Sequence, residues 1–256
     1  MTAPTTRIPV PPQPASSEAG LVISGAGLTH TGRVRSENED AILTDPAGVL
    51  WAIADGMGGY GHGDVASDLV TGALSEIEDT AIATPALRAA LMRANAQIQQ
   101  VAQTKGTGAF GATVVAAMFQ NGVAHIAWAG DCRAYLMRQR CLRLLTRDHT
   151  VVQDMIDQGL LRGEDSARHP DAHVVTRAVG YERELEVDAL SVPVVPGDVL
   201  MLCSDGLTAC LGDHDIADHM ARGGSAEALC AALVQDCLER GAPDNVSVIA
   251  AQVGAY

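Results

Sequence analysis

The sequence predicts an α+β fold in which two antiparallel β-sheets form a sandwich with helices on its outside. At least eight short segments are typical of strands, and several of them are joined by hairpin turns. About four segments have the periodicity of amphipathic helices, and these occur in pairs. Because strands and helices do not alternate regularly, a doubly wound parallel sheet is disfavoured. The chain has 256 residues, of which 47% are hydrophobic, which suits one globular domain.

The N-terminal segment, residues 1–20, holds five of the eleven prolines and is predicted to be a disordered tail. The folded domain then covers residues 21–256. Its first clear strand covers residues 49–54, a continuous apolar run that ends at Asp55 and a glycine-rich stretch. This pattern is typical of a buried strand that runs into a loop.

Two helices are predicted after this loop. Asp64 is the expected N-cap of the first, and Thr84 and Pro85 mark the start of the second, with threonine as the cap and proline in the first turn. The expected apolar stripes are Val65, Leu69, Ala73 and Ile77 in the first helix, and Leu87, Leu91, Ala94, Ile98 and Val101 in the second.

A hairpin follows, in which residues 109–119 and 122–130 form strands joined at Asn121-Gly122, a strong turn signal. Two more helices are expected, one after Asp213 and a longer one after Ser225. The remaining predicted strands cover residues 132–138, 141–145, 185–192, 198–203 and 245–253.

Residues 150–180 are polar and weakly patterned, apart from a helical start at Thr150–Gly159. They are predicted to form a mobile flap beside the functional site that shapes substrate choice rather than chemistry. His169 and His173 lie in this segment and are expected at the surface.

The net charge of −14, without a run of Lys or Arg, argues against a nucleic-acid partner. No apolar stretch approaches the ~18–20 residues needed to span a membrane, and no signal peptide is recognisable. None of the six cysteines forms a C-x-x-C pair, so reduced thiols in a cytoplasmic protein are favoured, and disulfides or a zinc site remain the alternatives.

Five aspartates each lie in a short polar cluster, and most of them adjoin an apolar run. They are Asp40, Asp55, Asp131, Asp205 and Asp244. If these clusters converge in the fold, their carboxylates suit a hard divalent cation, because Mg²⁺ and Mn²⁺ prefer oxygen ligands and keep several waters. The pattern predicts a metal-dependent hydrolase, although a single Asp-Gly pair is more often an ordinary turn.

Seven motifs in order connect these clusters to a known family. They are R-x-x-N-E-D at 35–40, D-G-M-G-G at 55–59, G-D-x-R at 130–133, L-T-x-D-H at 145–149, T-R-A-V-G at 176–180, S-D-G at 204–206 and D-N at 244–245. Together they resemble the 2C-type protein phosphatases (the PPM family), especially the bacterial form. The resemblance runs from about residue 25 to 253 and implies a sandwich flanked by helix pairs on both outer faces (α-β-β-α).

The resemblance also implies the roles of the acidic residues. Asp55 would bridge two Mn²⁺ or Mg²⁺ ions, the Gly56 carbonyl would bind one of them, and Asp205 and Asp244 would complete the protein ligands. Asp40, with Glu39 beside it, would hold metal-bound waters.

Arg35 resembles the phosphate-binding arginine of the family, and the alternative is a surface salt bridge to a neighbour such as Glu37. Asp131 matches the position that, together with Asp205, helps to hold a third ion in bacterial relatives. The alternative for Asp131 is a turn residue that pairs with Arg133.

The proton donor to the leaving oxygen is the least defined part of the site. The animal histidine position is Met57 here, and the residue after the glycine-rich motif, often histidine in bacterial relatives, is Tyr60. His62 could act as the general acid, but a metal-bound water is favoured. His149 and the segment 110–113 are expected to be structural.

The resemblance therefore implies a serine/threonine phosphoprotein phosphatase, in which a water or hydroxide that bridges two Mn²⁺ or Mg²⁺ ions attacks the phosphate monoester. The expected partners are phosphoserine and phosphothreonine proteins in the pathway of a serine/threonine kinase, and a monomer is expected. A catalytically dead relative that binds phosphoproteins is disfavoured because no expected aspartate is replaced. A nuclease is disfavoured by the acidic charge.

Overall fold

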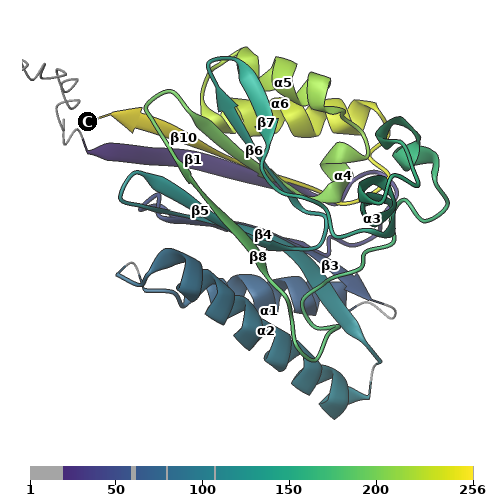
Figure 1. Cartoon of the computed structure of the whole chain (residues 1–256). Coiled ribbons are helices and arrows are strands. Elements are labelled where there is room, and N and C mark those ends of the chain that lie inside the picture. Colours follow the sequence, from purple (N-terminus) through teal and green to yellow (C-terminus); the bar gives the residue numbers. More distant parts are fainter. Residues whose placement is uncertain (1–19, 59–61, 79, 107, 256) are drawn as a thin grey trace, which may run out of the picture.

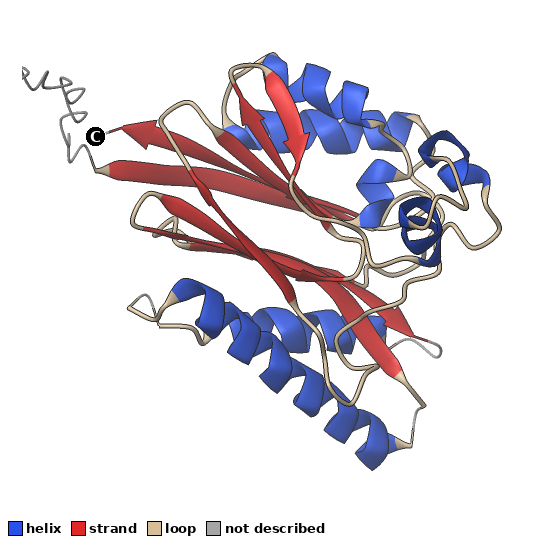
Figure 2. Ribbon diagram, viewed as in Figure 1, coloured by secondary structure: helices blue, strands red, loops and turns tan. Residues whose placement is uncertain are grey.

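The computed structural model describes residues 20–58, 62–78, 80–106 and 108–255. The predicted tail at residues 1–20 therefore lies outside the described residues, apart from Gly20. Four layers are visible in Figure 1 and Figure 2: a helix pair, two stacked sheets and a second helix pair. The predicted α-β-β-α sandwich is confirmed.

Each sheet has five strands, and every neighbouring pair is antiparallel. The first sheet has the order β1 (Leu21–His30), β10 (Val246–Ala255), β9 (Val199–Cys203), β6 (Arg133–Arg138) and β7 (Cys141–Leu144). The second has the order β2 (Asp40–Thr44), β3 (Leu50–Gly58), β4 (Phe110–Gln120), β5 (Val123–Ala129) and β8 (Asp188–Pro193).

The long helices cover the outer faces of the sheets. On the second sheet lie α1 (Gly63–Ser75) and α2 (Ala83–Lys105), and on the first lie α5 (Asp213–Ala221) and α6 (Ala226–Glu239). The short helix α4 (Asp205–Thr208) follows β9, and α3 (Val151–Asp157) and the 3-10 helix η1 (Gly163–Arg168) lie between β7 and β8. No helix among the described residues is long and apolar enough to cross a bilayer.

Three apolar cores hold these layers together, one between the sheets and one under each helix pair. The central core contains both tryptophans, Trp51 and Trp128, among smaller aliphatic side chains. In α2 the predicted stripe is buried from Leu87 to Ile98. In α1 the buried face centres on Ala66, Val70 and Leu74, because two adjacent apolar stripes compete on this helix. Of the predicted residues, Ala73 is buried, and Val65, Leu69 and Ile77 are only partly buried beside the core.

Several predicted boundaries are wrong. Strand β3 does not end at residue 54 but continues through Asp55 to Gly58, because the start of β4 supplies backbone partners there. Helix α1 begins at Gly63 with His62 at the N-cap position, and α2 begins at Ala83 without a side-chain cap. Strand β8 begins at Asp188, later than expected.

The strands β1 and β2 were not predicted as strands. The first contains two glycines, which weaken strand propensity, and the second is only five residues long. The hairpin prediction is confirmed: Asn121 and Gly122 both adopt positive φ, 52° and 74°, as a two-residue turn between β4 and β5 requires.

The segment that leads into β8 is anchored against α2 by Asn95. In Figure 1 this segment descends beside α2. The buried Asn95 side chain accepts a hydrogen bond from the Gly180 N–H (2.7 Å) and donates one to the Glu182 carbonyl (2.9 Å). A β-bridge between Ala112 and Val179 fixes the same segment to β4.

We expect Asn95→Ala to destabilise the protein, because it leaves the buried Gly180 N–H without its partner. The cost should be about 1–3 kcal/mol in the free energy of unfolding, measured by urea titration. Gln97→Ala is the matched control, since Gln97 is exposed on the same helix. Equal stability of the two variants would show that Asn95 does not anchor the segment.

Candidate metal centre

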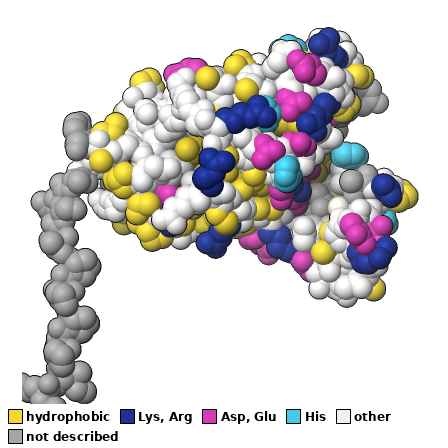
Figure 3. Space-filling view, turned by 90° about the horizontal axis from the view of Figure 1, so that it is seen from above, with side chains coloured by type: hydrophobic (Ala, Val, Ile, Leu, Met, Phe, Trp, Pro, Cys, Tyr) yellow, Lys and Arg dark blue, Asp and Glu magenta, His cyan; other side chains and the backbone are white. Residues whose placement is uncertain are grey.

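A polar cleft of about 570 Å³ lies where strands of both sheets end. Its lining residues are Arg35, Glu39, Asp55, Gly56, Met57, Gly58, Asp131, His173, Val175, Asp205, Ala209, Pro243, Asp244 and Asn245. In Figure 3 charged and histidine side chains gather toward the right-hand side of the view. Every predicted site residue except Asp40 lines this cleft.

Four of the acidic residues reach the cleft from separate elements. Asp55 lies within β3, Asp131 follows β5, Asp205 is the first residue of α4, and Asp244 shortly precedes β10. Residues almost 190 positions apart in the chain therefore face one space, as the aspartate pattern predicts.

Asp40 lies behind the cleft and joins the two sheets. It is directly opposite Asp55 in the β2–β3 pairing. Its Oδ2 accepts hydrogen bonds from the hydroxyls of Ser204 (2.9 Å) and Ser247 (2.6 Å), which belong to the end of β9 and to β10. Its buried Oδ1 has no hydrogen-bond partner among the described residues. A free, buried carboxylate oxygen suits a residue that orients waters around a cation.

The carboxylates of the cleft are held in an environment that disfavours their charge. Burial, and then the nearby charge of Asp205, raise the pKa of Asp131 to about 7. Burial also raises the pKa of Asp40 to about 7, against the effect of its two serine hydrogen bonds. The pKa of Asp55 is raised well above its usual range by burial and by the charges of Asp40 and Asp205. The pKa of Asp205 is raised by burial and by Asp244.

This cluster of mutually repelling carboxylates fits divalent cations, because bound positive charge would remove the penalty that raises the pKa values. No group of three or more His, Cys, Asp or Glu side chains in the described ranges forms a ready-made cation site. Mg²⁺ and Mn²⁺ do not require one, because such ions are often held by one or two carboxylates, with carbonyl oxygens and waters filling the remaining positions. The carboxylates and carbonyl oxygens of the cleft are therefore donors of the kind that these ions take.

Arg35 lies at the mouth of the cleft and pairs with Asp244, at 2.8 Å between Nη2 and Oδ2. Among the described residues the salt-bridge partner of Arg35 is thus Asp244, and not the nearby Glu37. The Arg35 side chain is 54% exposed. A pair this exposed contributes little to stability, and its guanidinium can exchange Asp244 for another anion.

The backbone around Glu39 and Gly56 is organised by Asn245, whose role was not predicted. Its Oδ1 accepts from the Glu39 N–H (2.8 Å), and its Nδ2 donates to the carbonyls of Thr31 (2.8 Å) and Glu37 (2.9 Å). The D-N motif marked this position as part of the family pattern, but the sequence does not reveal which backbone groups the amide contacts.

Glu39 contributes both its backbone and its side chain. Its carbonyl accepts from the Gly56 N–H, and its Oε1 accepts from the Gly63 N–H (3.2 Å) at the start of α1. A side chain at position 56 would place a Cβ 2.0 Å from the Gly63 carbonyl oxygen. Gly56 is thus required by close packing of backbone against backbone.

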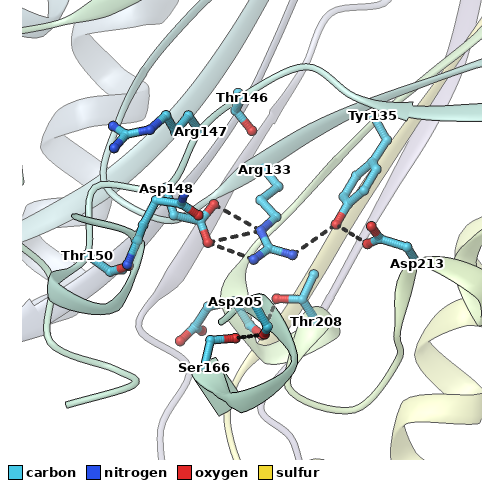
Figure 4. Close-up of polar contacts among 12 residues, drawn as sticks. Arg133, Tyr135, Thr146, Arg147, Asp148, Thr150, Ser166, Asp205, Thr208 and Asp213 are labelled. Carbon is cyan, nitrogen blue, oxygen red and sulfur yellow. Dashed lines mark hydrogen bonds and ion pairs between the residues drawn. The ribbon is translucent and has the colours of Figure 1, made fainter. Parts of the chain in front are cut away.

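Asp131 makes no salt bridge with Arg133, so the pairing in that alternative is wrong, although Asp131 does lie in a bend after β5. Figure 4 shows the Arg133 guanidinium gripping Asp148, with Nη2 to Oδ2 at 2.7 Å, and donating to the Tyr135 hydroxyl at 3.1 Å. The Tyr135 hydroxyl in turn donates to Asp213 at 3.0 Å. Since Asp148 occupies Arg133, the Asp131 carboxylate remains directed to the cleft that it lines.

The histidines near the cleft lie as expected, except that His173 lines the cleft itself. His62 packs its ring on Phe110, with 5.6 Å between centroids, and does not line the cleft. His173 is exposed, as predicted, yet it lines the cleft, which the sequence did not indicate. His149 is structural: its Nδ1 accepts from the Gly130 N–H, and burial lowers its pKa. Tyr60 lies outside the described residues.

Comparisons with known proteins show the family of this chain. Residues 27–240 match the family described as Protein phosphatase 2C. A serine/threonine phosphatase, stp, of Listeria welshimeri is 34% identical over 232 residues, which cover 86% of this chain and 92% of that protein.

Two solved structures extend the likeness. PppA of Pseudomonas aeruginosa, described as a key regulatory component of T6SS, superposes with a TM-score of 0.82 at 37% identity, covering 92% of this chain and all of that one. The catalytic domain of the serine/threonine phosphatase PstP in complex with two manganese ions gives a TM-score of 0.84 at 31% identity, covering 91% of this chain and 99% of that one.

Removing divalent cations should make stability depend on pH in a defined direction. Since the native pKa values of Asp40 and Asp131 are raised, the folded protein holds more protons than the unfolded chain between about pH 4 and about pH 7. In EDTA, the contribution of these groups to the free energy of unfolding should be full at the acidic end and decline as the pH rises through this window. Urea titrations at several pH values measure it.

The control is Asp131→Asn, which removes one buried carboxylate and should show a shallower decline than the wild type. Added Mn²⁺ should flatten the wild-type curve, because cations then offset the charge that protons offset at low pH. Identical pH curves for the variant and the wild type in EDTA would contradict the raised pKa of Asp131.

Proposed function

The chain belongs to the protein phosphatase 2C family, and we propose that Asp55, Asp205 and Asp244 hold the metal ions on which its activity depends. The protein is a metal-dependent serine/threonine protein phosphatase that uses Mn²⁺ or Mg²⁺ and acts on phosphoprotein substrates. The observation that carries the assignment of residues is the convergence of buried carboxylates with raised pKa values in one cleft.

When bound, the two ions supply a nucleophilic water at neutral pH and neutralise the charge of the phosphoryl group. Asp55 would help to hold the ions, and the Gly56 carbonyl would contribute one further oxygen. The unpartnered Oδ1 of Asp40 would orient water from behind, and Glu39 would assist from the start of α1. Asp131 and Asp205, which face the same space, would hold a third, weaker ion.

Arg35 would grip the phosphoryl oxygens at the mouth of the cleft. Its planar guanidinium can form two parallel hydrogen bonds to a phosphate, and its position beside Asp244 places that fork next to the proposed metal ligands. For the leaving oxygen we favour protonation by water in the cleft, because His62 packs on Phe110 and lies outside the lining residues.

The cellular setting is also a proposal. The six cysteines are all free, which supports a reducing compartment such as the cytoplasm. We also propose that the enzyme works as a monomer. We propose that the enzyme reverses the action of a serine/threonine kinase and has no nucleic-acid partner, which its net charge of −14 supports.

The metal assignment is tested by Asp205→Asn. The substitution removes a ligand charge, so Mn²⁺ affinity, measured by calorimetry, and turnover of a phosphothreonine peptide should both fall by at least tenfold. Asp218→Asn is the matched control, because Asp218 is exposed on α5. Wild-type Mn²⁺ affinity in Asp205→Asn would reject its role as a ligand.

The phosphate assignment is tested by Arg35→Ala. Losing a charged hydrogen bond to the phosphoryl group should lower kcat/KM by the equivalent of about 1.5–3 kcal/mol, with Mn²⁺ affinity little changed. Arg35→Lys keeps the positive charge but not the two-pronged guanidinium, so its kcat/KM should lie between those of the wild type and Arg35→Ala. Arg88→Ala, on the exposed face of α2, is the control. Unchanged steady-state kinetics in Arg35→Ala would assign Arg35 to the surface.

A further inference from the structure

A second hollow of about 260 Å³, here called the side pocket, opens beside the catalytic cleft. Its lining residues are Met57, His173, Val175, Thr176, Arg177, Ala178, Tyr181 and Glu182. It shares Met57, His173 and Val175 with the cleft, so the two spaces are contiguous. A cavity of ~150 Å³ can hold a benzene ring, so the side pocket has room for one amino-acid side chain.

Four of the eight residues that line the side pocket supply apolar surface, and the other four are polar or charged. Met57, Val175, Ala178 and the ring of Tyr181 supply apolar surface, and Tyr181 is 46% exposed. Arg177 is already engaged by Glu186 (3.0 Å) and Asp188 (3.1 Å). It therefore offers little free positive charge to an acidic ligand.

The wall that carries Ala178 and Tyr181 is held in place before any ligand arrives. Asn95 bonds the backbone of Gly180 and Glu182, and Gln99 also donates to the Glu182 carbonyl. Val179 pairs with Ala112 of β4. A preformed wall lowers the entropy cost of binding, which suits a specificity pocket.

A third hollow lies on the other side of Tyr181. A further hollow of about 660 Å³ is lined by Gln99, Gln103, Gly180, Tyr181, Arg183 and neighbouring backbone near the end of α2. Tyr181 lines both hollows, so the cleft, the side pocket and this groove follow one another along the surface. An extended peptide advances about 3.3 Å per residue, so a side chain close in sequence to the phosphorylated residue would meet the side pocket first.

We propose that the side pocket is a specificity subsite that binds an apolar side chain of the phosphoprotein, within two residues of the phosphorylated serine or threonine. This inference rests on the proposed function, because it uses the cleft as the place of the phosphate. Tyr181 and Thr176 determine the selectivity, the first as the outer wall and the second from the exposed rim.

The test uses phosphothreonine peptides that carry Leu, Ala or Asp at each of the two positions before and after the phosphothreonine. For the wild type with Mn²⁺, kcat/KM should be about tenfold higher for Leu than for Asp at one of these positions. Hydrolysis of a small aryl phosphate supplies the reference, since it does not reach the side pocket.

Three variants locate the selectivity. Thr176→Trp fills the side pocket from its rim and should abolish the preference for Leu. Tyr181→Ala removes the outer wall and should weaken the preference for Leu. Tyr181→Phe keeps the apolar ring and should retain this preference. All three should hydrolyse the aryl phosphate at the wild-type rate.

A wild type that hydrolyses the aryl phosphate but treats all peptides alike would overturn the subsite and leave the proposed function intact. A preference that persists in both Thr176→Trp and Tyr181→Ala would place the selectivity elsewhere and also overturn it. Peptide affinities measured by fluorescence anisotropy separate the two hypotheses. Selective binding of the Leu peptide without any turnover would support the subsite and contradict the proposed function.

Discussion

The burial of several aspartates in one small space is the constraint on which the rest of the structure depends. Asp40, Asp55, Asp131 and Asp205 all have raised pKa values, and burial is the largest cause for each. Carboxylates in such a place must gain protons or cations, or the chain around them must be held by other interactions. The fold provides these other interactions, and the phosphatase reaction of the family depends on the cations.

The stabilising interactions around the carboxylates are hydrogen bonds that connect the two sheets and the loop before β2. Asp40 on β2 accepts from Ser204 and Ser247, which belong to the opposite sheet, and Asn245 fastens the loop before β2 through three hydrogen bonds to backbone groups. These contacts satisfy buried backbone and hydroxyl groups and hold the segments around the cleft in one arrangement. The apolar cores on either side then set the distance between the layers.

Side-chain contacts anchor the two sides of the cleft, and residues 150–180 lie between these two anchored regions. On one side Arg133 binds Asp148 and reaches through Tyr135 to Asp213, which leaves Asp131 available to the cleft. On the other side Asn95 fastens the segment before β8 to α2. Residues 150–180 include His173, which lines the cleft and the side pocket. We propose that substrate choice varies with this segment and the side pocket while the carboxylates stay in place.

The sequence by itself determined the fold class, the hairpin at Asn121-Gly122 and the set of aspartates, because each depends on local pattern or on motifs in a fixed order. Tertiary structure alone decided the rest. The extension of β3 through Asp55 needed backbone partners from β4, and the buried face of α1 depended on which of two apolar stripes met the sheet. The pairing of Arg133 with Asp148 instead of Asp131, the anchoring role of Asn95 and the position of His173 at the cleft arise from contacts between residues 15 or more positions apart. Local sequence does not encode such contacts, because several partners of similar chemistry are available until the layers pack.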